Sequence, residues 1–119
     1  MKLTTEDKKY ILDEYLKHIS CIADNDYQKR IWIYGAGPEV DSFDDTVCDF
    51  FTICDFILEN YKDFGITEAQ YKTLKKLRDE FRVFADENDL PEEFIDTPKW
   101  ANIMDLAKEV LKAFNYKKF

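Results

Sequence analysis

Apolar residues recur at every third or fourth position through three stretches of the chain, with polar residues between them. This is the pattern of amphipathic helices that bury one face. The first stretch predicts a helix from Thr5 to Asp24, preceded by Thr4 as its cap. The second is expected to begin after Thr67, and the third at Thr97-Pro98. Threonine before a helix accepts a hydrogen bond from the free amides of the first turn, and proline suits the first helical position.

A further helix is predicted from Phe43 to Tyr61, with Ser42 as its cap. Apolar residues surround most of its circumference, so we expect it to lie centrally in the molecule. Its polar positions fall within one arc of about 120° at the helical period. These positions are Asp45, Asp49, Thr52, Asp55 and Glu59.

The segment from Tyr27 to Tyr34 is compatible with two structures. Its β-branched and aromatic residues favour an extended strand, whereas its length also allows a short helix. The run Gly35-Ala36-Gly37-Pro38 ends it in either case. Another single helical turn is expected after Pro91, within the connection from Asp86 to Asp96.

These elements predict an all-α fold. The 119 residues fit one domain, residues 1–119, and the 3 Gly and 3 Pro leave little room for an all-β fold rich in turns. Four amphipathic helices joined by short connections pack best as a bundle. We therefore expect a single-domain bundle of four main helices with one or two short extra helical or extended segments.

The net charge of −8 is concentrated in one part of the chain. From Ile31 to Tyr61 there are seven acidic residues and no Lys or Arg, and Phe84 to Pro98 is a second acidic block without a base. Such a charge argues against nucleic acid or an anionic membrane as the partner and favours a basic protein. Acidity also keeps many proteins soluble, so charge alone does not decide between these interpretations.

Catalytic and metal-binding patterns are not found in the sequence. His18 is the only histidine, and its pairing with Glu14 is not repeated on another helix, so we expect a partly exposed histidine and no metal site. Cys48 and Cys54 point about 120° apart on one helix and are expected to be buried, inert thiols. Gly35-Ala36-Gly37 is expected to be a tight turn. We predict a protein that is not an enzyme and has no cofactor.

The N-terminal residues have no apolar run after their positive charge, so no signal peptide is expected. The most apolar run, Phe50 to Leu58, is too short to span a membrane. Three cysteines without an export signal indicate reduced thiols. Together these features predict a cytoplasmic protein.

Phe56 falls on the polar arc of the helix predicted from Phe43 to Tyr61. An aromatic side chain within a charged rim is typical of a binding hot spot. The alternative is that the segment from Tyr27 to Tyr34 folds over this arc and buries Phe56. In both cases the acids near the Gly-Pro turn are expected at the surface, with Trp32 and Tyr34 beside them.

The run from Trp32 to Asp45, in a small acidic helical protein, resembles a segment of bacterial immunity proteins. Proteins of this kind include the nuclease-colicin immunity proteins and those of contact-dependent growth inhibition. The resemblance implies a protein that binds a cognate toxin domain, often a basic nuclease. It also implies that binding blocks the active site of the toxin or a nearby surface.

We therefore interpret the chain as an immunity protein, a monomer when free, that neutralises a basic toxin domain through an acidic surface. The expected partner-binding residues are Tyr34, Glu39, Asp41, Asp44, Asp45, Asp49 and Phe56. The alternative is a phage or mobile-element protein that mimics nucleic acid, or a generic protein-interaction module. A small enzyme or metal-binding bundle is the third hypothesis, which inward-facing carboxylates near His18 would favour.

Overall fold

The structure, a computed structural model, describes residues 4–35 and 42–116. Its four long helices are α1 (Thr5–Ile22), α3 (Phe43–Glu59), α4 (Glu68–Glu87) and α6 (Pro98–Ala113). Three short elements join them: α2 (Asn25–Tyr27), η1 (Gln28–Ile33) and α5 (Pro91–Phe94). The described residues form no strand, which confirms the all-α single domain that the sequence predicts.

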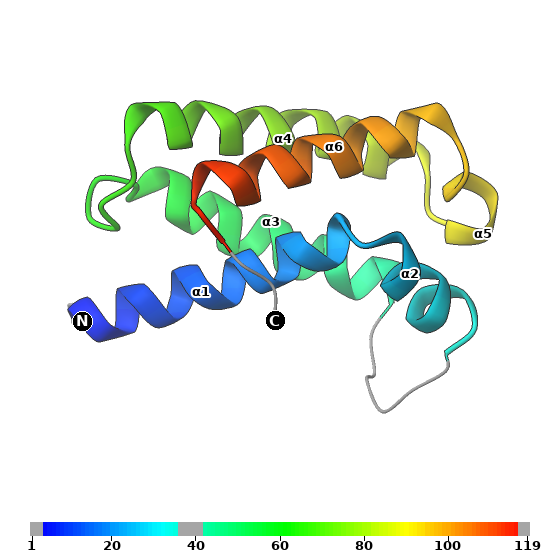
Figure 1. The fold of residues 1–119 in the computed structure, drawn as a ribbon, viewed down its shortest axis with the longest axis horizontal. Coiled ribbons are helices and arrows are strands. Elements are labelled where there is room, and N and C mark those ends of the chain that lie inside the picture. The colour runs from blue at the N-terminus through cyan, green and yellow to red at the C-terminus, as the bar shows by residue number, and fades with distance from the viewer. Residues whose placement is uncertain (1–3, 36–41, 117–119) are drawn as a thin grey trace.

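The four long helices form a closed bundle. α4 packs beside α6, α6 beside α1, α1 beside α3, and α3 beside α4. Figure 1 shows α4 and α6 together along one side of the molecule, with α1 along the other. The short elements α2 and α5 lie at the end where α3 begins. None of the described helices combines the length and apolar character needed to cross a membrane.

Local capping interactions begin the helices where the sequence predicts. The Thr4 hydroxyl accepts a hydrogen bond from the amide of Asp7 at 3.0 Å, and the Thr67 hydroxyl accepts one from Gln70 at 3.1 Å. In both cases the side chain three residues later, Asp7 or Gln70, accepts a hydrogen bond from the threonine amide, which completes a capping box. Thr97 caps α6 ahead of a proline. α1 and α3 each end two residues earlier than expected, within the usual uncertainty of helix ends.

Aromatic side chains from five elements form the core at the α5 end of the bundle. Trp100 of α6 is fully buried at the centre of this cluster. Its ring lies 4.9–6.1 Å, between centroids, from those of Trp32, Phe43, Phe81, Phe84 and Phe94. Pairs at these separations add about 0.5–1.5 kcal/mol each beyond the burial of area. The cluster therefore fixes η1 and α5 against the long helices.

The segment from Tyr27 to Tyr34, for which the sequence allowed either a strand or a short helix, is helical. Residues 28–33 form a π-helical turn, which continues from α2. The side chain of Gln28 is fully buried, and its amide nitrogen donates to the carbonyl oxygens of Cys21 and Ile22 at 3.0 and 2.7 Å. Its amide oxygen accepts a bond from the Trp100 indole nitrogen at 2.8 Å. Gln28 thus caps the carboxyl end of α1 and ties it to α6.

Candidate partner-binding surface

The outer arc of α3 is a solvent-exposed surface that carries most of the acids predicted for it. The exposed residues of this arc are Asp44, Asp45, Cys48, Asp49, Thr52, Phe56 and Glu59. The opposite face, with Phe50, Cys54 and Ile57, is completely buried in the core. The helical period thus separates a polar arc from an apolar one, as the sequence predicts.

Among the described residues, Asp55 is the acid of α3 that forms ion pairs. Its carboxylate accepts from the Arg78 guanidinium on α4 at 2.9 Å, and Arg82 lies 3.8 Å away. The sequence did not reveal this pairing, because the two arginines lie on another helix. Asp44, Asp45, Asp49 and Glu59 make no ion pair with any described residue.

The structure brings part of each acidic block, the start of α3 and the short helix α5, to the same end of the bundle (Figure 1). The rings of Phe43, at the start of α3, and Phe94, at the end of α5, are 4.8 Å apart. The exposed acids of the first two turns of α3 and those of α5 are called the acidic end. Its members are Asp44, Asp45, Asp49, Glu92 and Glu93. None of the five is ion-paired within the described part of the chain.

At this end of the bundle, Lys29 of η1 forms an ion pair with Asp96. Lys29 lies 3.9 Å from Asp96, and both side chains are largely exposed. A pair of this kind contributes about 0–1 kcal/mol, and it includes none of the five acids of the acidic end. Tyr34, at the end of η1, has 75% of its surface exposed and supplies an aromatic side chain with a polar tip.

The predicted site residues are only partly brought together. Asp44, Asp45 and Asp49 share the first two turns of α3, whereas Phe56 lies seven residues further, about 10 Å along the axis from Asp49. Phe56 is 42% exposed and packs edge-on against Phe64, with the ring centroids 5.9 Å apart. Glu39 and Asp41 lie outside the described residues.

The expectation that residues 27–34 bury Phe56 is wrong. Trp32 of this segment packs against Phe43 at the other end of α3, with 5.5 Å between ring centroids. The Gln28–Trp100 hydrogen bond holds the segment there. Phe56 therefore remains accessible, but as a separate feature near the loop before α4 and not as the centre of the acidic end.

The two cysteines of α3 differ, and the expectation that both are buried is wrong for Cys48. Cys54 is completely buried beside Tyr15, and burial raises the pKa of its thiol to about 12. Such a thiol stays protonated and unreactive at neutral pH. Cys48 is exposed on the acidic arc. The helical period already places it about 60° from Asp45, which was the available signal.

The described residues contain no cluster of three or more His, Cys, Asp or Glu side chains placed to hold a metal ion. His18 on α1 is half-buried, as the sequence predicts. Comparison of the chain with protein-family models, with curated proteins and with solved structures finds no significant match.

Proposed function

We propose that this protein acts by binding a basic partner protein through the acidic end, and that the partner is the toxin domain of a bacterial toxin system. In that role the chain is an immunity protein. The observation that carries the proposal is the presence, at one end of the bundle (Figure 1), of five exposed acids of α3 and α5 that are not ion-paired within the described residues: Asp44, Asp45, Asp49, Glu92 and Glu93. The resemblance of the run from Trp32 to Asp45 to immunity proteins supports the choice of partner.

The acidic end is suited to fast association. Charges of one sign gathered on a rigid end attract a basic domain and raise the association rate above that of neutral surfaces. The buried contact between Phe43 and Phe94 packs the start of α3 against α5. The exposed ring of Tyr34 offers an aromatic contact that, once desolvated by the partner, slows dissociation.

Co-purification tests the proposal directly. The tagged protein is expressed together with the genes that neighbour its own, and the proteins that elute with it at moderate salt are identified. We expect a stoichiometric, basic, toxin-like domain whose lethality the protein suppresses. The proposal would be abandoned if no such toxin domain bound the protein or if a bound toxin stayed lethal.

Variants then locate the interface on the identified toxin. The triple variant Asp44→Lys/Asp45→Lys/Asp49→Lys is compared with Asp13→Lys/Asp105→Lys/Glu109→Lys, which makes the same charge change at exposed positions of α1 and α6. We expect the first to weaken binding at least about 100-fold, because several desolvated or nearby charge pairs are reversed. The second should stay within about fivefold of the unmodified protein.

Mimicry of nucleic acid is the second candidate, favoured by the paired acids Asp44-Asp45 and Glu92-Glu93 at one end of the molecule. A mimic would compete with DNA for several unrelated basic proteins, whereas an immunity protein would bind its own toxin domain alone. Competition assays with a panel of DNA-binding proteins separate the two.

A further inference from the structure

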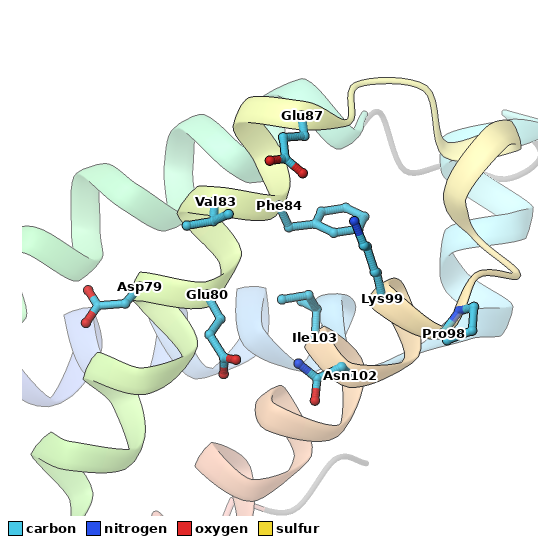
Figure 2. A pocket seen from close by; sticks show the side chains of 9 residues that line it. All are labelled: Asp79, Glu80, Val83, Phe84, Glu87, Pro98, Lys99, Asn102 and Ile103. Atoms are coloured by element: carbon cyan, nitrogen blue, oxygen red, sulfur yellow. The ribbon is translucent and has the colours of Figure 1, made fainter.

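A groove of about 620 Å³ lies between α4 and α6. Neither of these helices contributes a residue to the acidic end. Figure 2 shows α4 along one side of it and the beginning of α6 along the other. The buried side chains of Phe84 and Ile103 form its floor. Val83 stands on the α4 wall with 60% of its surface exposed, so it adds accessible apolar area beside the groove floor.

The α4 wall carries an acid, an apolar pair and an acid in succession. Glu80, Val83, Phe84 and Glu87 follow at i, i+3, i+4 and i+7, so they lie on one face across two helical turns, about 10 Å. Within the described part of the chain neither glutamate has an ion-pair partner. Both are therefore available to a ligand.

The groove has two other charged residues within the described chain. Asp79 already has ion-pair partners, and Lys99 lies on the opposite wall, which α6 forms. Asp79 binds Lys75 at 2.8 Å and Arg78 at 3.3 Å, and the hydrogen bond from Lys75 lowers the pKa of its carboxyl. Of the described residues that line the groove, Lys99 on α6 is the one base, and Asn102 stands beside it. Lys99 extends from α6 toward the Phe84 ring in Figure 2.

We propose that this groove is a docking site for a short amphipathic helix of a partner protein, one whose apolar side chains are flanked by Lys or Arg one turn before and after. A helix laid along α4 places its apolar anchors over Val83, Phe84 and Ile103, which is the helix-in-groove mode of recognition. Its flanking bases then meet Glu80 and Glu87, which have the same two-turn separation. The volume lies within the range of about 300–1,000 Å³ typical of binding sites.

Charge selects this occupant over a second copy of the chain. Two copies would each bring a net charge of −8, and self-association would set Glu80 and Glu87 of each copy against an acidic protein. A basic helix instead compensates the two glutamates while it covers Val83. The inference is independent of the proposed function, because no residue of the acidic end lines the groove.

A synthetic helix tests the proposal on the full chain. The probe is a fluorescent, end-capped, alanine-rich 16-residue peptide with leucines at i+3 and i+4 and lysines at i and i+7, so that the lysines have the two-turn separation of Glu80 and Glu87. Its twin has glutamate at each lysine position. We expect the basic peptide to bind with a dissociation constant in the micromolar range, by fluorescence anisotropy at low salt. The acidic twin should bind at least about tenfold more weakly.

Variants of the protein then place the peptide. Val83→Ser is expected to weaken binding about fivefold, since the exposed apolar surface of Val83 is no longer covered. Glu80→Gln/Glu87→Gln is expected to weaken it about tenfold and to remove most of its salt dependence. The control Asp13→Asn/Glu59→Gln makes the same change of charge on α1 and α3 and should stay within about twofold of the unmodified protein.

Three results would overturn the proposal. The first is equal binding of the two peptides, which would remove the role of charge. The second is equal binding to the unmodified protein, to both groove variants and to the control, which would place the peptide elsewhere. The third is a dimer of the free protein in sedimentation that Val83→Ser dissociates, because the groove would then be occupied by a second copy.

Discussion

Replacing Gln28 with leucine tests the interaction that holds the irregular segment in place. The substitution keeps the approximate size of a fully buried side chain and removes three hydrogen bonds. The Trp100 indole nitrogen loses its acceptor at 2.8 Å, and the carbonyl oxygen of Ile22 loses its donor at 2.7 Å. The carbonyl oxygen of Cys21 keeps the amide of Asp24 as a partner at 3.2 Å.

The magnitude follows from the two groups left without a partner. Each buried polar group that loses its hydrogen bond costs about 1–3 kcal/mol, and the added apolar burial of leucine offsets about 1 kcal/mol. We expect Gln28→Leu to lower the free energy of unfolding by about 3 kcal/mol. For a domain of this size that corresponds to a fall in Tm of about 10–15 °C.

Urea and thermal unfolding, followed by circular dichroism and tryptophan fluorescence, measure this loss. A double-mutant cycle with Trp100→Phe separates the hydrogen bond from packing, because phenylalanine has no indole donor. In the Trp100→Phe background we expect Gln28→Leu to cost about 1–2 kcal/mol less than in the unmodified protein. A loss under about 1 kcal/mol, or two costs that are equal, would refute the role assigned to Gln28.

Three further predictions concern stability. Burial raises the pKa of the Cys54 thiol to about 12 and also raises the pKa of Tyr15, so both groups ionise more readily in the unfolded chain. Their contribution to the free energy of unfolding should therefore be constant below about pH 9 and fall as pH rises toward 12. Urea titrations at pH 8, 9 and 10 measure this fall, and a flat profile would contradict it. Thr67→Ala should cost about 1 kcal/mol in thermal unfolding through loss of the α4 cap, and an unchanged Tm would show that the cap is not needed. Arg78→Met should cost less than about 1 kcal/mol, because its partner Asp55 is 43% exposed; a loss above 2 kcal/mol in urea unfolding would show a stronger pairing.

The helices could be predicted from the sequence because their signals are local. A capping threonine lies within three residues of the group that it binds, as Thr4 and Thr67 show, and the apolar period repeats within one helix. The same locality predicted an exposed acidic arc on α3. The helical period also places Cys48 on the exposed arc of α3, where the structure has it.

The rest depended on contacts between distant parts of the chain. Residues 28–33 are held by contacts that include the Gln28–Trp100 bond, across 72 positions of sequence. Likewise, the meeting of the start of α3 with α5 follows from the packing of Phe43 on Phe94, and the neutralisation of Asp55 from Arg78 on another helix. Side-chain type at one position contains no signal for such contacts, since many pairings satisfy the same pattern.

The association rate of the cognate toxin domain, measured by stopped-flow fluorescence at increasing salt, tests the central claim most directly. The account predicts a rate constant above about 10⁷ M⁻¹s⁻¹ at low salt that falls at least tenfold by about 0.5 M salt. It also predicts that the triple variant Asp44→Lys/Asp45→Lys/Asp49→Lys associates slowly at every salt concentration. Equal rates for the triple variant and the unmodified protein at low salt would contradict it.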